Sequence, residues 1–341
     1  MITPLSASEF LQQSKDNLTL DVRSEGEYNY GHIPHAVSLP LFTNEERKVV
    51  GTAYKQQSKE AAMLLGLDIV GKKMSGFVNA IKPQAKENKV FVHCWRGGMR
   101  SGSMAWLFDL FGYEVYTLKG GYKAYRHAVL DVLSGERKYI VLGGKTGSGK
   151  TAVLHRLTEM GEQVLDLEAL ANHKGSAFGM LGQPAQPSTE HFENLLHLKL
   201  TEFDLNRRIW LEDESKKIGT VVLNNELWQG MNAAPLFYID VPQQIRIGRL
   251  TREYGANHLE GLKQSLTNIR KRLGGLDWKE AMTALEQNNF EQVARLTLNY
   301  YDKAYEHHLA QQKERAVTEL VFEVDDTNAI ATALINKADT V

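Results

Sequence analysis

Short apolar runs alternate with segments of helical periodicity in the first part of the chain. Between the runs, apolar side chains recur three and four positions apart, as they do within residues 101–111. Strands that alternate with helices are typical of a mostly parallel sheet with helices on both faces. The strands are predicted at residues 18–23, 37–40, 90–92 and 114–118.

The same alternation resumes after a polar break at residues 133–138. From residue 256 the chain is mainly helical. The pattern therefore predicts two α/β domains, at residues 1–133 and 139–341, the second with a helical C-terminal part. Its strands are predicted at residues 139–142, 163–168, 208–215 and 236–242.

Composition restricts the class of partner. The 40 lysines and arginines nearly balance the 41 aspartates and glutamates, so a nucleic-acid partner would need a local basic patch. The single cysteine excludes an internal disulfide and a thiolate-rich metal site, and fits a reducing compartment. We see no signal peptide, and no apolar segment approaches the ~20 residues that span a bilayer. We expect a soluble cytoplasmic protein, with neither a membrane nor DNA as partner.

The single cysteine, Cys94, follows one of the apolar runs and precedes a helical segment. At such a strand-to-helix turn, backbone N–H groups form an anion nest. Arg96 and Arg100 add charge, which we expect to lower the pKa of the thiol and favour the thiolate. A cysteine that only fills a core does not usually lie beside two arginines and a Gly-Gly pair. Cys94 is the predicted catalytic residue, and the predicted nest is formed by Trp95, Arg96, Gly97, Gly98, Met99 and Arg100.

The second domain opens with a phosphate-binding motif. The strand at residues 139–142 runs directly into residues 144–151, which match the P-loop pattern G-x-x-x-x-G-K-T. The glycines let backbone N–H groups wrap a phosphate chain, Lys150 adds a point charge, and Thr151 is suited to bind Mg²⁺. The predicted phosphate-binding residues are Gly144, Gly147, Ser148, Gly149, Lys150 and Thr151.

Acids and arginines suited to assist this loop follow later strands. The strands at 163–168 and 208–215 both end in acids, and the sequence does not choose which acid holds Mg²⁺ through water. The helix after residue 242 carries three arginines spaced by three, and resembles the arginine-bearing lid region of small-molecule P-loop kinases. The candidates for Mg²⁺ or phosphate contact are Asp166, Glu212, Asp213, Arg246, Arg249 and Arg252.

A second basic cluster, Arg270, Lys271 and Arg272, ends at a Gly-Gly helix stop. Further along the chain, Tyr300 and Tyr301 place aromatic rings beside charges. Basic groups near tyrosines are able to bind RNA through phosphate and stacking contacts. The cluster is therefore the candidate for tRNA contact.

The first domain resembles a rhodanese domain over roughly residues 1–133. The resemblance implies a cysteine that carries sulfur as a persulfide. Asp21 and Arg23 are expected to form a buried pair at the sheet end, and His32 and His93 to be structural. The stretches that carry the resemblance are residues 21–24, 27–28, 31–34, the Cys94 loop and 118–121.

The Cys94 loop is one residue longer than the commoner sulfur-transferring rhodanese loop. Five residues separate Cys94 from Arg100. This HC-x5-R spacing resembles the loop of cysteine-dependent phosphatases, including those built on the rhodanese fold. A wider nest is able to hold a larger anion, such as phosphate or a selenium-bearing group.

The whole chain resembles the tRNA 2-selenouridine synthase family. The family converts wobble 2-thiouridine to 2-selenouridine through an S-geranyl-2-thiouridine intermediate, using geranyl diphosphate and selenophosphate. The resemblance implies that Cys94 carries the selenium and that the P-loop cradles a diphosphate. It implies no tightly bound cofactor, and a selenophosphate-supplying enzyme as partner. It rests on the pairing of the two domains and on residues 94–101, 166–168, 171–179, 212–219 and 300–302.

Two other functions fit parts of the pattern. A cysteine-dependent phosphatase fused to a small-molecule kinase would release phosphate from an aryl phosphate in a Cys94-dependent reaction. A regulatory nucleotide-binding module would use the rhodanese domain only for docking. The intact Cys94 loop argues against the regulatory module, because docking alone does not require a thiolate.

Overall fold

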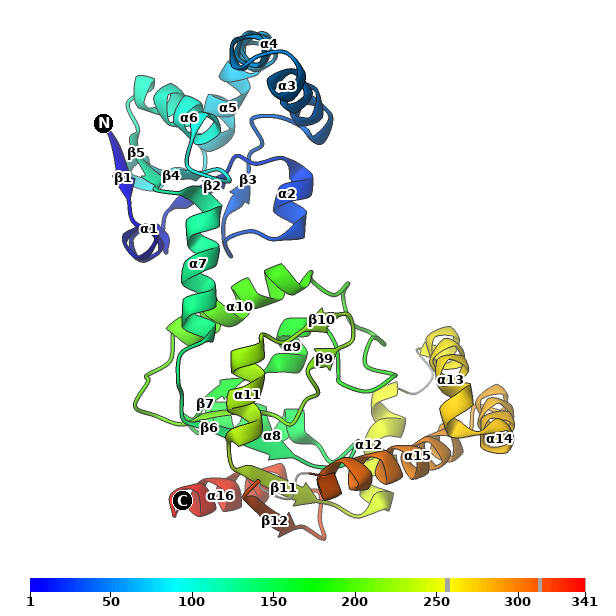
Figure 1. The fold of residues 1–341 in the computed structure, drawn as a ribbon. Coiled ribbons are helices and arrows are strands. Elements are labelled where there is room, and N and C mark those ends of the chain that lie inside the picture. The colour runs from blue at the N-terminus through cyan, green and yellow to red at the C-terminus, as the bar shows by residue number, and fades with distance from the viewer. Residues whose placement is uncertain (255–257, 312–314, 341) are drawn as a thin grey trace. The chain divides into compact units, whose positions relative to one another are not determined.

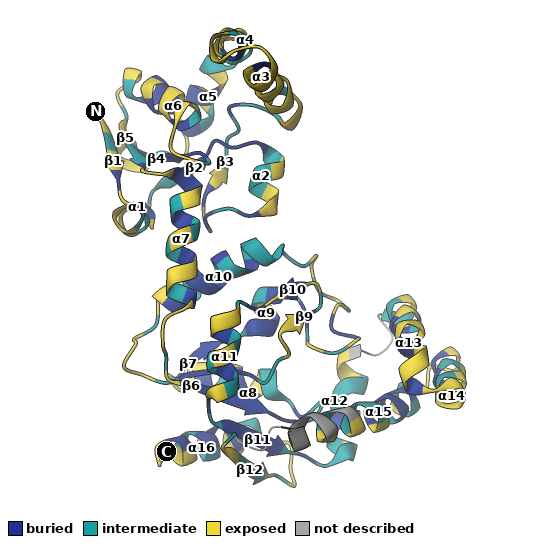
Figure 2. Cartoon of the chain, in the orientation of Figure 1, coloured by how far each residue is buried: buried dark blue, intermediate teal, exposed yellow. Residues whose placement is uncertain are grey.

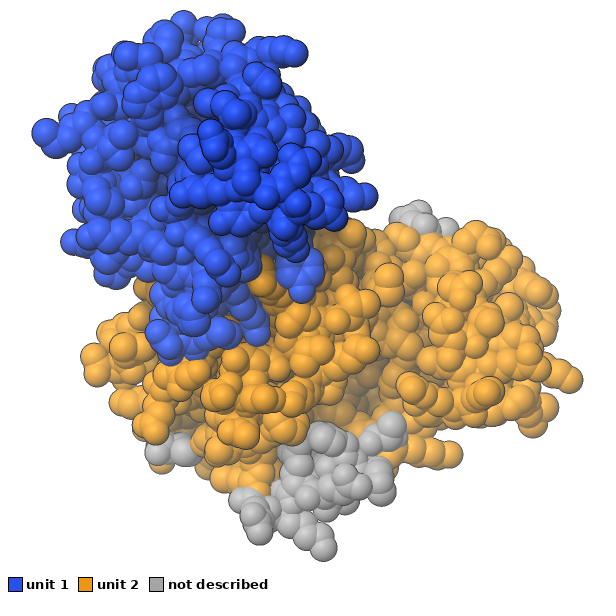
Figure 3. All heavy atoms as spheres, turned by 45° about the horizontal axis from the view of Figure 1, so that its top comes forward, with its two compact units in different colours: residues 1–132, 193–198 blue, residues 133–192, 199–341 orange. Residues whose placement is uncertain are grey.

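The computed structural model describes residues 1–254, 258–311 and 315–340, which form two compact units (Figure 3). Unit 1 comprises Met1–Val132 and Glu193–Leu198, and unit 2 comprises Leu133–Phe192 and Lys199–Val341. The first segment of unit 1 ends at Val132, directly before the polar break at residues 133–138. Residues 193–198, which the pattern placed in the second domain, cluster instead with unit 1, because their side chains find their partners there.

Unit 1 is built on a five-stranded, fully parallel sheet with the order β1-β5-β4-β2-β3 (Figure 1). The strands are β1 (Ile2–Leu5), β2 (Leu18–Asp21), β3 (Val37–Ser38), β4 (Lys89–His93) and β5 (Glu114–Leu118). The helices are α1 (Ala7–Ser14), α2 (Glu25–Tyr30), α3 (Asn44–Gln56), α4 (Lys59–Gly71), α5 (Met74–Ile81), α6 (Met99–Leu110) and α7 (Gly121–Leu133), with a 3-10 turn at Lys86–Asn88.

The central strand β4 is enclosed on both faces, since Val90, Phe91 and Val92 are all buried. Strands buried on both faces read as continuous apolar runs, which explains why this one was visible in the sequence. Phe77 of α5 and Phe108 of α6 belong to the same core cluster as Val90, and so does Cys94. The thiol therefore starts from the rigid core of the unit.

Unit 2 contains a second fully parallel sheet with the order β12-β11-β6-β8-β7, and a two-stranded antiparallel ribbon. The strands are β6 (Tyr139–Gly143), β7 (Gln163–Leu165), β8 (Ile209–Glu212), β9 (Lys217–Ile218), β10 (Val221–Val222), β11 (Leu236–Asp240) and β12 (Val317–Val321). The helices are α8 (Lys150–Glu159), α9 (Leu167–Ala171), α10 (Thr189–Thr201), α11 (Asn225–Ala233), α12 (Gln243–Tyr254), α13 (Leu259–Leu273), α14 (Gly275–Glu286), α15 (Phe290–Gln311) and α16 (Thr327–Ala338).

The structure confirms the α/β class of both domains and the helical C-terminal part, with one exception. Strand β12 interrupts the helices and pairs in parallel with β11. Its five residues alternate between exposed and half-buried, as on an edge strand, and a run this short does not stand out from its helical surroundings. The predicted start of the helical region at residue 256 lies outside the described residues. Among the residues that are described, no helix is long and apolar enough to cross a membrane.

Asp21 and Arg23 form the expected buried pair at the end of β2. Their side chains are almost inaccessible to solvent, and Arg23 Nη2 lies 2.6 Å from Asp21 Oδ2. The same nitrogen donates to the Gly31 carbonyl at 2.6 Å. The pair thus fixes the loop after α2 to the sheet.

We predict that Arg23→Leu lowers the free energy of unfolding by about 3–5 kcal/mol, because it leaves a carboxylate buried without its counter-charge. Urea denaturation of the full chain measures the loss. The control is Arg47→Leu, because Arg47 also binds an acid, Glu27, but is 51% exposed. It should cost less than about 1 kcal/mol. Equal losses in the two variants would contradict a special role for the buried pair.

Candidate active site in unit 1 and phosphate loop in unit 2

Cys94 follows β4 directly and lies at the strand-to-helix turn that the sequence predicted. Its side chain is 3% exposed, and Sγ lies 3.2 Å from Ser101 Oγ in the first turns of α6. The intervening residues 96–99 are exposed. The sulfur is therefore held at the base of an exposed loop.

Hydrogen bonds lower the pKa of Cys94. Burial alone would raise the pKa, but the Ser101 hydroxyl and the backbone N–H groups of Ser101, Arg96 and Gly98 outweigh burial and hold the pKa below its ordinary value. Arg100 is turned toward Glu27, with Nη1 2.7 Å from Oε2. From the sequence we expected the charges of Arg96 and Arg100 to lower the pKa of Cys94. In the structure, the pKa is lowered instead by the backbone N–H groups of the nest and by the Ser101 hydroxyl.

The first residues of α7 form hydrogen bonds with the backbone of the Cys94 loop. The N–H groups of Tyr122 and Lys123 donate to the first two carbonyls of the loop, at 2.8 and 3.0 Å. Gly97 has φ +65°, and a Cβ there would lie 2.5 Å from a carbonyl oxygen at the end of β5. Gly121 has φ +62° and lies directly against the Cys94 carbonyl. Because α7 takes the carbonyls, the N–H groups of the loop face the sulfur.

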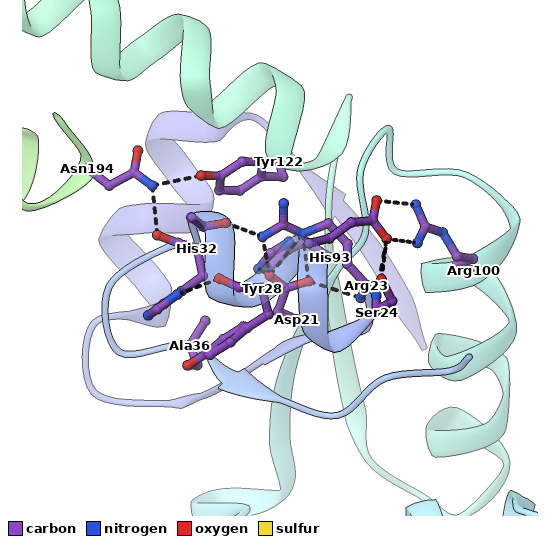
Figure 4. A network of polar contacts seen from close by, with 12 residues as sticks. Asp21, Arg23, Ser24, Tyr28, His32, Ala36, His93, Arg100, Tyr122 and Asn194 are labelled. Carbon is purple, nitrogen blue, oxygen red and sulfur yellow. Dashed lines mark hydrogen bonds and ion pairs between the residues drawn. The ribbon is translucent and has the colours of Figure 1, made fainter. Parts of the chain in front are cut away.

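A buried polar network supports this end of α7 (Figure 4). The Arg23 guanidinium lies over the Tyr122 ring, 3.7 Å from its centre. Asn194 Nδ2 donates to the Tyr122 hydroxyl at 2.7 Å and to the His32 carbonyl at 2.9 Å. Asn194 is fully buried and comes from the stretch of α10 that clusters with unit 1. No sequence pattern indicated Asn194, because a single amide in a helix matches no motif.

Both histidines near the site serve packing. His93 is fully buried, and burial lowers its pKa to about 4 even though Asp21 Oδ2 lies 3.9 Å away. Its ring is therefore neutral at neutral pH. His32 stacks on Tyr28 with ring centres 3.9 Å apart, and burial lowers its pKa too.

In unit 2, the predicted phosphate-binding loop lies between β6 and α8. Lys150 Nζ donates to the Gly144 carbonyl at 2.9 Å. Gly147 and Gly149 have φ of +79° and +86°, a region that favours glycine. The loop leaves β6, whose neighbours are β8 on one side and β11 on the other, so it lies at a topological switch point of the sheet. Loops at the carboxyl end of such a strand, followed by a helix N-terminus, bind phosphate.

Two of the predicted acids are already engaged. Asp213 accepts hydrogen bonds from the Tyr305 hydroxyl and from Arg315, each at 3.0 Å. Asp166 caps α9 by accepting from the Ala169 N–H at 2.7 Å. Both carboxylates therefore bind groups outside the P-loop.

Glu168, which the candidate set omitted, is hydrogen-bonded to the Thr151 hydroxyl of the P-loop. Its Oε2 is 3.3 Å from Thr151 Oγ1, and it is hydrogen-bonded to Glu214. Strand β7 ends at Leu165, so Glu168 lies on α9 and not on the predicted strand. Burial, followed by repulsion from Glu168, raises the pKa of Glu214 to about 8. Glu212 is fully buried, and burial raises its pKa as well.

The three arginines of α12 have different environments. Arg246 is buried and forms a bidentate ion pair with Asp302, at 2.8 and 2.7 Å. Arg249 binds Asp325 and a carbonyl of the P-loop. Arg252 is 73% exposed. Arg246 is therefore occupied by a buried ion pair, and Arg249 is hydrogen-bonded to the backbone of the P-loop. Arg252 lies at the surface.

The basic cluster Arg270, Lys271 and Arg272 lies exposed in the last turn of α13. The guanidinium of Arg270 lies over the Trp278 ring, 4.4 Å from its centre. One of the three charges is thus held in place by packing, and all three face solvent.

Known proteins match both units. A family model described as the tRNA 2-selenouridine synthase AAA domain matches residues 137–332, and a rhodanese-like domain model matches residues 6–128. The chain belongs to the tRNA 2-selenouridine synthase family. The resemblance drawn from the motifs is thereby confirmed.

Relatives in the synthase family align over nearly the whole chain. The tRNA 2-selenouridine synthase of Shewanella denitrificans is 32% identical over 91% of this chain and 92% of its own length. That of Pseudomonas putida is 34% identical over 90% and 92%. A solved structure, the N-terminal domain of a putative ATP/GTP binding protein from Clostridium difficile, is 39% identical over 38% of this chain and 99% of its own, with a TM-score of 0.34.

We predict that Ser101→Ala raises the pKa of Cys94, because the thiolate loses a hydroxyl donor. The rate of alkylation by iodoacetamide near neutral pH should fall on the order of tenfold, the equivalent of one hydrogen bond to a charged group. The pH dependence of alkylation measures the shift. Ser103→Ala on the same helix is the control, because Ser103 only donates to the Met99 carbonyl. An unchanged profile for Ser101→Ala would contradict the assignment.

We predict that the acids beside the P-loop make stability fall as pH rises. The pKa of Glu214 is about 8 in the folded protein, against 4.5 for an ordinary glutamate. Between these values the folded protein holds a proton that the unfolded chain has lost, so stability is full below about pH 4.5 and declines toward pH 8. Glu214→Gln should flatten the decline, as measured by urea denaturation across this range without divalent cations. The exposed Glu226→Gln should leave the slope unchanged, and a wild-type slope in Glu214→Gln would refute the prediction.

Proposed function

We propose that the protein is a tRNA-modifying transferase that replaces the sulfur of wobble 2-thiouridine with selenium. The proposed cycle has an alkylation step, which attaches a geranyl group from geranyl diphosphate to that sulfur, and a substitution step, which exchanges the alkylated sulfur for selenium. Family membership favours this reaction over the phosphatase–kinase alternative. The observation that carries the proposal is that one chain holds a hydrogen-bonded thiolate site and a separate P-loop.

Cys94 is the proposed selenium carrier. Its lowered pKa supplies the thiolate that forms the S–Se bond. Selenophosphate delivers selenium at the selenide level, so in this loading step the Se–P bond breaks, phosphate leaves, and two electrons pass to an external disulfide. In the substitution step the C2–S bond of the alkylated base breaks, a C2–Se bond forms, and the sulfur leaves with its hydrocarbon chain as a thiol. Selenium leaves an S–Se bond as selenide only when two electrons are added. Because the chain has no second cysteine, an external thiol is part of the proposed cycle.

The P-loop is the proposed site for the diphosphate of the alkyl donor. Lys150 and the N–H groups of the loop would bind its oxygens without any need for ATP hydrolysis. Among the described residues, no three His, Cys, Asp or Glu side chains are arranged to hold a metal alone. The oxygen donors Thr151 and Glu168 suit Mg²⁺ that is shared with phosphate and water, and Mg²⁺ would offset charge on the leaving diphosphate.

The tRNA substrate needs a basic surface, because the whole chain carries a net charge of only −1. The exposed cluster at the end of α13 is the proposed contact in unit 2. Selenophosphate, supplied by a separate enzyme, is the proposed selenium donor.

Two variants separate the two steps. The alkylation step needs no protein thiol, so Cys94→Ser should still form S-geranyl-2-thiouridine but no 2-selenouridine. Lys150→Ala removes a positive charge from the P-loop and leaves the core intact. The rate of geranyl transfer by this variant should fall at least about tenfold, because the diphosphate loses a charged hydrogen-bond donor. The variant should still convert pre-geranylated tRNA. Nucleoside mass spectrometry of tRNA incubated with geranyl diphosphate and selenophosphate measures both products.

Each outcome has a defined reading. Wild-type levels of 2-selenouridine from Cys94→Ser would show that another group carries selenium. Wild-type geranylation by Lys150→Ala would give the P-loop a different role. Cys94-dependent release of phosphate from an aryl phosphate, without either nucleoside product, would favour the phosphatase.

A further inference from the structure

An apolar groove of about 1010 Å³ lies in unit 1 between α3, α4 and α6. Sites for small molecules usually enclose roughly 300–1,000 Å³, so this groove is large enough for one. Its apolar wall includes Phe42, Leu67, Val70, Met74, Met99 and Trp106.

Several of these side chains are exposed although they are large and apolar. Leu67 is 67% exposed, Met99 56% and Trp106 54%. Figure 2 shows how much of α3 and α4 is exposed or only half-buried. A contiguous exposed apolar surface of this kind marks a binding site for an apolar group.

Glycines widen the groove. Gly51 of α3 and Gly102 of α6 line it, and a Cβ at either position would have no atom within 4 Å. Glycine weakens a helix interior, so helix stability does not account for these two residues. The space above them belongs to the groove.

The charged side chains that line the groove are all cationic: Arg47, Lys48, Lys55, Lys59 and Arg100. Arg47 and Arg100 are paired with Glu27, which does not line the groove. The three lysines are left to face an anionic ligand, so the ligand combines an apolar body with anionic groups.

The groove adjoins the end of the Cys94 loop. Met99 and Arg100 belong to the predicted anion nest and also line the groove, which continues along α6 to Leu107. The hydroxyl of Ser101, which lies between Arg100 and the rest of α6, is 3.2 Å from the sulfur. An apolar group bound here extends from the neighbourhood of the thiol along one helix.

We propose that this groove binds the hydrocarbon chain of the S-alkylated tRNA base while the base is presented to Cys94, with Lys48, Lys55 and Lys59 facing RNA phosphates. The inference rests on the proposed function and adds to it. It assigns the recognition of the alkyl group in the substitution step to unit 1. The hydrocarbon group that makes the sulfur a leaving group would then also bind the alkylated base to the protein.

The test uses anticodon stem-loop RNAs whose wobble 2-thiouridine carries either an S-methyl or an S-geranyl group. The wild-type chain should bind the S-geranyl RNA at least tenfold more tightly, since each buried methylene contributes about fourfold. Gly102→Leu fills the groove and should abolish this preference without changing affinity for the S-methyl RNA. Gly76→Leu is the matched control, because Gly76 of α5 also has open space above it but does not line the groove.

The outcomes separate the groove from the reaction. Equal wild-type affinity for the two RNAs, or a preference that survives in both Gly102→Leu and Gly51→Leu, overturns the groove assignment. In that case, formation of 2-selenouridine from the S-geranyl RNA in the same samples, with selenophosphate and a thiol, leaves the proposed function intact. Loss of the preference in Gly76→Leu as well would show a general defect and also overturns the assignment. Absence of 2-selenouridine with the wild-type chain would reject the proposed function itself.

Discussion

The Cys94 site depends on the contact between its loop and the first residues of α7. Each loop residue has one carbonyl and one N–H, and the two point in opposite directions across a tight turn. Because Tyr122 and Lys123 bind the carbonyls, the N–H groups are left to face the sulfur. The contact needs hydrogen atoms in place of side chains at Gly97 and Gly121. The parallel sheet, the buried Asp21–Arg23 pair and the Tyr122 ring then fix both partners.

The two sites use the same backbone device for different chemistry. In unit 1, N–H groups around a buried sulfur favour the thiolate. In unit 2, the loop leaves room for a larger anion and adds the ammonium of Lys150. Glu168 and Glu214 lie beside it and share a proton, which keeps the cluster from carrying its full negative charge near neutral pH. Backbone dipoles therefore lower the pKa of the thiol in unit 1, whereas titratable carboxyl groups lie beside the P-loop in unit 2.

The sequence predicted the parts of each site that are contiguous. The nest and the P-loop are each formed by about eight consecutive residues, with a strand before and a helix after, and such motifs read directly from the chain. Partners that arrive from elsewhere could not be predicted. Asp302 neutralises Arg246 from another helix, and Asn194 reaches Tyr122 from a helix 72 residues away. Ser101 lies in the stretch 94–101 that carries the family resemblance. Only the distance between its hydroxyl and the sulfur indicates that it lowers the pKa of the thiol.

The middle of α10 has a consequence for synthesis on the ribosome. Chains emerge from the N-terminus, and a unit folds when its last segment is available. Unit 1 receives Asn194 only after β6, α8, β7 and α9 of unit 2 have left the exit tunnel. Until then Asn194 does not donate to the Tyr122 hydroxyl or to the His32 carbonyl. The support that Asn194 gives to the thiol site is thus available only after the P-loop has been synthesised, although both Cys94 and its loop come earlier in the chain.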